Sequence, residues 1–128
     1  MEKPIVHCGI VGSRSITNKE YVFSVLNFYL ARLLEENEVV VVSGGAVGID
    51  SLAENFAAEK NLKTEIYLPD WQTHGKKAGF LRNQTIVDNS DYLIAITTGS
   101  NGTADSIKRA QKKGIPIKII QYEIRDSI

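Results

Sequence analysis

Apolar and polar positions recur along the chain with two periods, one typical of buried strands and one typical of amphipathic helices. Several of the short runs rich in Val and Ile are apolar on both faces, as parallel strands covered by helices are. The runs lie at residues 5–11, 39–42, 64–68, 92–96 and 115–120, and helices are predicted between them at residues 19–37, 49–60, 79–89 and 103–113. This pattern predicts an α/β fold: a single three-layer domain in which a parallel sheet of about five strands has helices on both faces.

The first predicted helix has an unusually wide apolar surface. Its start has the T-x-x-E spacing of a capping box, so we expect Thr17 to cap it. Tyr21, Phe23 and Phe28 extend the apolar surface beyond one stripe, which predicts either deep burial or contact with a second subunit. We expect a homodimer or a higher homo-oligomer. The tail, residues 121–128, fits either a short edge strand or a loose end.

Composition narrows the class of protein. At 128 residues the chain is long enough for one domain with a continuous core. Lys and Arg total 15, as do Asp and Glu, and this zero net charge argues against a general nucleic-acid coat or a membrane-surface binder, although it allows a local basic patch. The single cysteine, Cys8, is expected to be buried and inert. No apolar run approaches the roughly 20 residues of a membrane span, so we expect a cytoplasmic protein without a membrane partner.

The segments that follow the predicted strands are rich in glycine and hydroxyl groups. Ligands of parallel sheets bind beyond the carboxyl ends of the strands. Glycine lets backbone N–H groups approach a ligand, and a helix start offers unpaired N–H donors, so we expect phosphate-binding loops. The loops after the second and fourth strands are expected at adjacent strand ends, where they share one anion, although tight turns need glycine in any case. The ligand-binding residues predicted from the loops are Gly12, Ser13, Arg14, Ser43, Gly44, Gly45, Gly48, Asp50, Gly99, Ser100, Asn101, Gly102 and Thr103.

Two arginines supply the positive charge expected beside this anion. Arg14 follows the first strand, and its forked guanidinium can hold a phosphate with two hydrogen bonds. Arg82 lies in the first turns of the third predicted helix, next to Asn83, which we also assign to the site. Either arginine also fits a plain surface position or a helix-side ion pair.

Three further side chains are assigned to the site from their positions. Asp50 is placed either to hydrogen-bond a ribose hydroxyl or only to cap its helix. Asp70 is a second candidate for a sugar contact, and Trp71 either stacks on a base or closes the rim of the pocket. The sequence does not separate these alternatives.

Several other chemistries lack their motifs. Neither a G-x-x-x-x-G-K-[ST] loop nor a dinucleotide fingerprint is present, which disfavours hydride transfer. His7 alternates with apolar neighbours and is expected to be a core histidine. His74 has no second His or Cys nearby, so no metal site is expected. No serine lies in a nucleophile elbow.

Five ordered motifs together cover nearly the whole chain. They are GIVGSRSIT at 9–17, VVSGGAVGIDSLAENFA at 41–57, LPDW at 68–71, GFLRNQTIVDNSDYLIAI at 79–96 and NGTADSIKRAQKKGIPI at 101–117. In this order they resemble the SLOG superfamily of Rossmann-like nucleotide-ligand binders, and within it the stand-alone YspA-like branch, which is frequent in bacteria and their phages. The resemblance implies one Rossmann-like domain over residues 1–128 and a nucleotide-like ligand that is sensed or sequestered. It implies no required cofactor, and the host cytoplasm if a phage encodes the chain.

One relative within the superfamily, the DprA family, binds single-stranded DNA. It has a G-S-R after its first strand, S-G-x-A-x-G-I-D after its second and R-N in a later helix, and this chain is similar at all three. A DNA-binding strip here would use Arg14, Lys76, Lys77 and Arg82. However, Val47 stands where that family usually has an arginine, and the zero net charge also weakens a DNA role.

A second relative, the LOG group, cleaves the N-glycosidic bond of nucleoside 5′-monophosphates. Its catalytic glutamate aligns with Ser106, which has no carboxylate, although its arginine does have a counterpart in Arg82. Asp105 is one position away and about 100° around a helix. The resemblance therefore implies binding without that hydrolysis, and a hydrolase would have to use Asp50, Asp70 or Asp105 as its acid.

Overall fold

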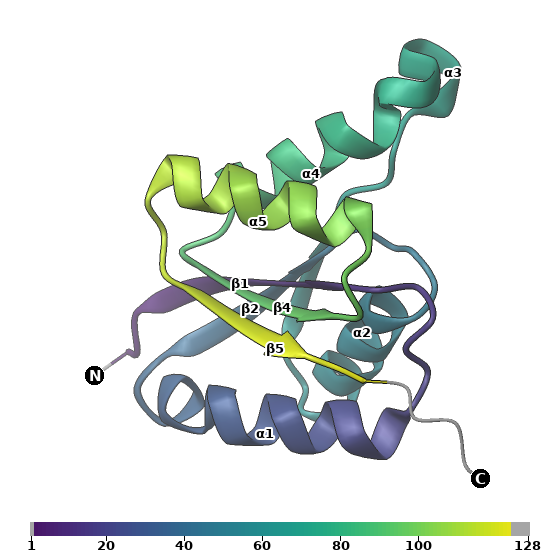
Figure 1. Cartoon of the computed structure of the whole chain (residues 1–128). Helices are drawn as coiled ribbons and strands as arrows, with labels where there is room; N and C mark the ends of the chain where they lie inside the picture. Colours follow the sequence, from purple (N-terminus) through teal and green to yellow (C-terminus); the bar gives the residue numbers. More distant parts are fainter. Residues whose placement is uncertain (1, 124–128) are drawn as a thin grey trace, which may run out of the picture.

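The computed structural model describes residues 2–123 and contains a five-stranded sheet in the order β3-β2-β1-β4-β5 (Figure 1). The strands are β1 (Ile5–Gly12), β2 (Glu38–Ser43), β3 (Lys63–Ile66), β4 (Tyr92–Thr97) and β5 (Ile117–Gln121). Every neighbouring pair is parallel. The strand order reverses between β1 and β4, and the carboxyl ends of these two strands form the switch point at which such sheets bind ligands.

Helices cover both faces of this sheet. They are α1 (Lys19–Glu36), α2 (Ile49–Glu59), α3 (Trp71–His74), the 3-10 helix η1 (Gly75–Lys77), α4 (Ala78–Asp88) and α5 (Asn101–Lys113). In Figure 1, α1 and α2 lie on one face of the sheet, and α4 and α5 lie on the other. The predicted three-layer α/β architecture with a Rossmann-like sheet is confirmed.

Two hydrophobic clusters fill the spaces between the layers. Successive residues of a strand point to opposite faces, so Ile10 and Val41 pack against α1 and α2, while Val11 and Val42 pack against α4 and α5. Cys8 is fully buried, and this burial raises the pKa of its thiol to about 12, as expected for an unreactive cysteine. Burial of each large apolar side chain stabilises the fold by about 1.5–3 kcal/mol, and the core holds the strand ends in fixed positions.

Two local predictions are wrong. Asn18, not Thr17, caps α1: its side-chain oxygen accepts a hydrogen bond from the Tyr21 amide at 3.0 Å, and asparagine is among the best capping residues. His7 is not a core histidine, because its side chain is 32% exposed and its Nε2 lies 3.0 Å from a carboxylate oxygen of Glu65. It occupies the amino-terminal half of β1, which is less deeply buried than the carboxyl half.

The segment between β3 and α4 departs most from the expected pattern. The strand predicted to reach residue 68 ends at Ile66, and the short helices α3 and η1 follow. In Figure 1, α3 projects from the body of the domain. Residues 70–77 are all exposed, and Asp70 caps α3 by accepting a hydrogen bond from the Thr73 amide at 3.1 Å. This segment has no apolar period from which its helices could be predicted.

Most of the wide apolar surface of α1 packs within the chain. Tyr21 contacts Tyr122, with ring centroids 4.9 Å apart, and Phe23 contacts Phe56 edge-on at 5.4 Å. Phe28, in contrast, is 76% exposed. Contact with a second subunit stays a prediction, and it now rests on the outer face of α1 around Phe28.

Two further points concern the ends and the surface of the domain. Within the undecided tail, residue 121 completes β5 and the backbone N–H of Tyr122 donates to the Thr97 carbonyl oxygen, whereas residues 124–128 lie outside the described part. Among the helices of residues 2–123, none is both long enough and apolar enough to cross a membrane.

Candidate functional site

The loops that follow β1, β2 and β4 line one cleft at the carboxyl edge of the sheet. The expectation that the loops after β2 and β4 lie at adjacent strand ends is wrong, because β1 lies between these strands. Three cavities, of about 400, 440 and 190 Å³, have Arg14 and Arg82 in their walls. The two arginines therefore lie where the three cavities meet.

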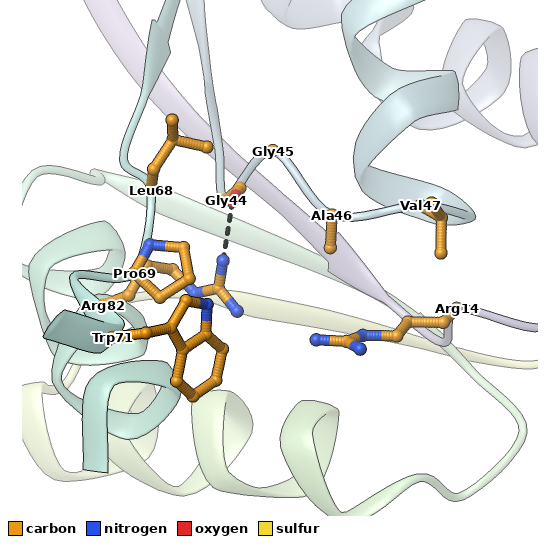
Figure 2. Close-up of a pocket in the computed structure, with 9 residues that line it drawn as sticks. All are labelled: Arg14, Gly44, Gly45, Ala46, Val47, Leu68, Pro69, Trp71 and Arg82. Carbon is orange, nitrogen blue, oxygen red and sulfur yellow. Dashed lines mark hydrogen bonds between the residues drawn. The ribbon is translucent and has the colours of Figure 1, made fainter. Parts of the chain in front are cut away.

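The three cavities differ in the residues that they add to the two arginines. The cavity of about 400 Å³ is shown in Figure 2 and is called here the apolar lobe; it adds Gly44, Gly45, Ala46, Val47, Leu68, Pro69 and Trp71. The cavity of about 440 Å³, called the polar lobe, adds Gly12, Ser13, Ser15, Ala46, Asp50, Ser100, Gly102 and Thr103. The smallest cavity, called the side lobe, adds Trp71, Lys76, Gly79, Phe80, Asn83 and Gly102.

The side chains of Arg14 and Arg82 enter the cleft from opposite sides (Figure 2). Arg82 donates from Nη1 to the carbonyl oxygen of Gly44 at 2.6 Å. Its partial burial lowers the pKa of the guanidinium; the charge of Asp50 opposes this change and the charge of Arg14 adds to it. Among residues 2–123, neither arginine forms an ion pair with a carboxylate. Two like charges that face one cleft without such a partner favour an anionic ligand.

A polar network behind Arg82 sets its orientation. Asn83 is 7% exposed and accepts a hydrogen bond from Arg82 Nε at 3.2 Å. Its Nδ2 donates to Asp105 Oδ2 at 3.1 Å and to the Gly102 carbonyl oxygen at 3.3 Å. The same Asp105 oxygen accepts from Arg109 Nε at 2.7 Å. Asn83 thus connects α4 to α5 and orients Arg82, while the carboxylate of Asp105 is already engaged.

Asp50 is a buried acid in the wall of the polar lobe. The residue is 6% exposed, and Oδ2 accepts a hydrogen bond from the Ala46 amide at 3.2 Å. Burial raises its pKa from the ordinary 3.8 to about 6, although that hydrogen bond and the charges of Arg82 and Arg14 act in the opposite direction. Gly48 holds the cap position of α2, so helix capping does not account for Asp50. A carboxyl group that titrates near neutrality in a cavity is typical of functional sites.

The glycine loop after β2 uses its amides within the protein. The Ala46 amide donates to Asp50, and the Gly45 amide lies 3.5 Å from Ser43 Oγ. Ser43 itself is buried and donates to Glu54 Oε2 at 3.0 Å. The expectation that this loop offers free amides to an anion is therefore wrong for Gly45 and Ala46.

In the loop after β4, only the amides of the first half are used within the protein. The Thr98 amide donates to Ser13 Oγ and the Gly99 amide donates to Thr97 Oγ1, both at 2.9 Å. These two amides are not available to an anion either. Residues 101–103, in contrast, form the first turn of α5, where backbone N–H groups have no intrahelical acceptor. They are the donors that this loop can still offer.

Hydroxyl groups join the loop after β1 to the start of α5. Ser13 Oγ lies 2.9 Å from Ser100 Oγ, which in turn lies 3.0 Å from Thr103 Oγ1. Ser13 and Thr103 are buried. These hydroxyls hold the wall of the polar lobe together as well as lining it.

Gly102 differs from other glycines of the cleft. A Cβ atom at Gly12 would clash with the Ile96 carbonyl oxygen, and one at Gly48 would lie 2.5 Å from the Arg14 carbonyl oxygen, so packing within the chain requires glycine at both. A Cβ atom at Gly102 would meet no other atom within 4 Å, and the residue has no positive φ. Nothing within residues 2–123 requires glycine there, whereas a ligand beside the start of α5 would.

The structure leaves five of the predicted residues outside the three lobes. Ser43 and Gly48 are buried supports of the loop after β2, and Gly99 and Asn101 are exposed. Asp70 lines a separate cavity of about 190 Å³. Of these positions, the geometry favours a direct role only for Asn101, through its backbone N–H in the first turn of α5.

Sequence reasoning also missed residues that line the lobes. Ser15, Leu68, Pro69 and Phe80 belong to the walls, and all four lie within the quoted motifs, which was the available signal. The contact of Glu54 with the β2 loop had no signal in the sequence. Within residues 2–123, no group of three or more His, Cys, Asp or Glu side chains is arranged to hold a metal ion.

Known proteins resemble the chain in sequence. A family model described as YspA, cpYpsA-related SLOG family matches residues 8–74. Gene 61 protein of Mycobacterium phage D29 is 38% identical over 115 residues, which cover 84% of this chain and 90% of that protein.

Solved structures resemble it in fold. DNA processing protein A (DprA) from Streptococcus pneumoniae superposes with a TM-score of 0.75 at 22% identity, over 97% of this chain and 52% of that one. The chain therefore spans about half the length of that protein, and the likeness shows the fold alone. The molybdenum cofactor binding protein from the phototrophic bacterium Rippkaea orientalis has a TM-score of 0.71 at 28% identity, over 96% of this chain and 79% of that one.

Proposed function

The chain belongs to the YspA, cpYpsA-related SLOG family, and we propose that it binds a nucleotide or a nucleotide-derived small molecule in the cleft at the carboxyl edge of its sheet. The observation that carries this proposal is the pair Arg14 and Arg82, which face one cleft without a carboxylate partner in the described part of the chain. The likeness to a molybdenum cofactor binding protein supports a small ligand. We propose that the ligand is a signal, which the protein senses or sequesters.

In this proposal the two arginines and the start of α5 hold the anionic group. Arg82 is already positioned by Gly44 and Asn83 and presents its remaining guanidinium N–H groups to the cleft. Arg14 is exposed and can close on a bound anion from the opposite side. Asp50 lines the polar lobe and is the acid that we assign to a sugar hydroxyl.

A thermal-shift panel of nucleoside mono-, di- and triphosphates and cyclic nucleotides tests the proposal. At 100 times the Kd, a bound ligand stabilises the folded state by about 2.7 kcal/mol. We expect Arg14→Ala to lose this ligand-induced stabilisation while the ligand-free protein unfolds as before, because Arg14 is exposed. Arg32→Ala removes the same charge from α1, outside the three lobes, and is the matched control. A full response of Arg14→Ala to the ligand would refute the assignment.

Hydrolysis of the bound nucleotide is a second candidate function, and Asp50 is the observation that favours it. Of the three acids considered, Asp50 alone lines the lobes, and burial raises its pKa to about 6. Asp70 caps an exposed helix, and Asp105 is engaged by Arg109. Chromatography of nucleoside monophosphates incubated with the protein would reveal released base. Release that disappears in Asp50→Asn would establish the hydrolase, whereas binding without release supports a sensor.

Single-stranded DNA is a further alternative ligand, since Lys76 adds a third cation to the cleft. Retention of oligonucleotides that weakens with salt, with no effect of mononucleotides, would favour DNA.

The related phage protein supports the proposal that this chain works in a cytoplasm, the host's if a phage encodes it. We also propose self-association through the outer face of α1, where Phe28 is exposed.

A further inference from the structure

Large apolar side chains gather on one wall of the cleft. Val47, Leu68 and Trp71 are 65%, 70% and 52% exposed, and all three line the apolar lobe. Exposed apolar residues scattered singly need no explanation, but several around one cavity mark a binding surface. The polar lobe has no such wall, because serine, threonine and aspartate side chains line it.

Trp71 is the one aromatic residue of this wall, and it is held at the edge of two cavities. It is the first residue of α3, and it borders both the apolar lobe and the side lobe. Its ring lies 3.6 Å from where a Cβ atom of Gly79 would be, so the indole lies beside the start of α4. Figure 2 shows the indole beside the cavity, with the segment Gly45–Ala46 on a different wall.

The junction of the lobes brings this aromatic ring close to two positive charges. Arg14 and Arg82 line the apolar lobe together with Trp71. An indole offers a flat, polarisable face on which a planar ring can stack. A purely apolar ligand would leave both arginines unused, and an inorganic anion would leave Trp71 unused.

We propose that the ligand combines a planar heteroaromatic ring with an anionic group, as nucleoside monophosphates do, and that its ring stacks on Trp71 in the apolar lobe while its anionic group lies between Arg14 and Arg82. The inference rests on the proposed function and adds the orientation of the ligand and the residue that recognises its ring. The sugar of such a compound then faces the polar lobe and Asp50.

Trp71 is the single tryptophan of the chain, so its fluorescence reports on this wall alone. The probes are AMP, GMP, CMP and UMP, with ribose 5-phosphate and inorganic phosphate as matched compounds that lack the ring. Binding is measured independently by thermal shift and calorimetry. We expect at least one nucleotide to bind and to quench the emission of Trp71, and ribose 5-phosphate to bind more weakly without quenching it.

Variants separate stacking from plain closure of the rim. Trp71→Ala should weaken nucleotide binding by about 5- to 150-fold, the range that base–aromatic stacking commonly contributes. It should leave the affinity for ribose 5-phosphate unchanged, and Trp71→Phe should restore most of the nucleotide affinity. Tyr92→Ala removes a partly exposed aromatic ring at the start of β4, outside the three lobes, and serves as the control.

The outcomes distinguish the inference from the proposed function. Nucleotide binding with unchanged Trp71 emission and an unaltered Kd in Trp71→Ala would overturn the stacking and leave the proposed function standing. Equal weakening of nucleotide and ribose 5-phosphate binding in Trp71→Ala would also overturn it, since Trp71 would then only shape the rim. Failure of every probe to bind the wild-type protein would overturn both.

Discussion

The buried carboxyl of Asp50 should lower the free energy of unfolding at neutral pH, relative to a neutral side chain of the same size. Replacement of Asp50 by asparagine keeps the size of the side chain and an oxygen that can accept the hydrogen bond of the Ala46 amide, now 3.2 Å from Oδ2. It removes a charge that is buried without an ion-pair partner among residues 2–123. We therefore expect Asp50→Asn to stabilise the folded state.

The magnitude follows from the pKa of Asp50. Its rise from 3.8 to about 6 corresponds to about 3 kcal/mol, since one pKa unit is worth about 1.36 kcal/mol. Below pH 3.8 the group is protonated in both states and has no effect. Between pH 3.8 and about 6 it is ionised mainly in the unfolded chain, so folding stability falls as pH rises. Above pH 6 the full loss of about 3 kcal/mol is present.

Urea unfolding of both proteins at pH 8 and pH 4 measures this difference. We expect Asp50→Asn to exceed the wild type by up to about 3 kcal/mol at pH 8 and by less than about 1 kcal/mol at pH 4. Asp88→Asn, at the exposed end of α4, should change stability by less than about 0.5 kcal/mol at either pH. An Asp50→Asn variant that is less stable than the wild type at pH 8 would refute the reasoning, because Asp50 would then be a structural group.

Three further predictions concern other parts of the cleft and the surface. Gly102→Ala should leave unfolding unchanged or slightly raise its midpoint, since the added methyl meets no other atom of the described chain, yet it should weaken nucleotide binding in calorimetry; unchanged affinity would remove Gly102 from the site. Asp105→Asn should reduce affinity severalfold through misplacement of Arg82, and a stability loss with unchanged affinity would mean that its network is only structural. Phe28→Ser should shift the protein to a smaller species in analytical ultracentrifugation at matched concentrations, whereas a monomeric wild type would contradict self-association.

The central strands could be predicted from the sequence because they are covered on both faces. Such strands read as continuous apolar runs, and β1, β2 and β4 begin and end within about one residue of the runs that predicted them. The edge segment at β3 ended two residues early, because Leu68 turns toward the cleft instead of the core. The helices α3 and η1 are too short to show an apolar period, so they were not predicted.

The candidate site was predicted in its location and its charges but not in its hydrogen bonds. Arg14 and Arg82 meet at the cleft because Arg14 lies just after β1 and Arg82 lies in the first turns of α4, and the sequence predicted both positions. Strand order is a tertiary property, so the sequence could not reveal that β1 separates the two glycine loops. Nor could it reveal that side-chain oxygens of Ser13, Thr97 and Asp50 accept hydrogen bonds from the loop amides. These contacts depend on how the loops fold and on which loops lie together.

A crystal structure of the protein with the nucleotide that stabilises it most tests the central claim most directly. The account predicts that the anionic group of this nucleotide lies within hydrogen-bond distance of both guanidinium groups, Arg14 on one side and Arg82 on the other. A fully occupied nucleotide whose anionic group touches neither arginine, or that binds outside the cleft, would contradict it.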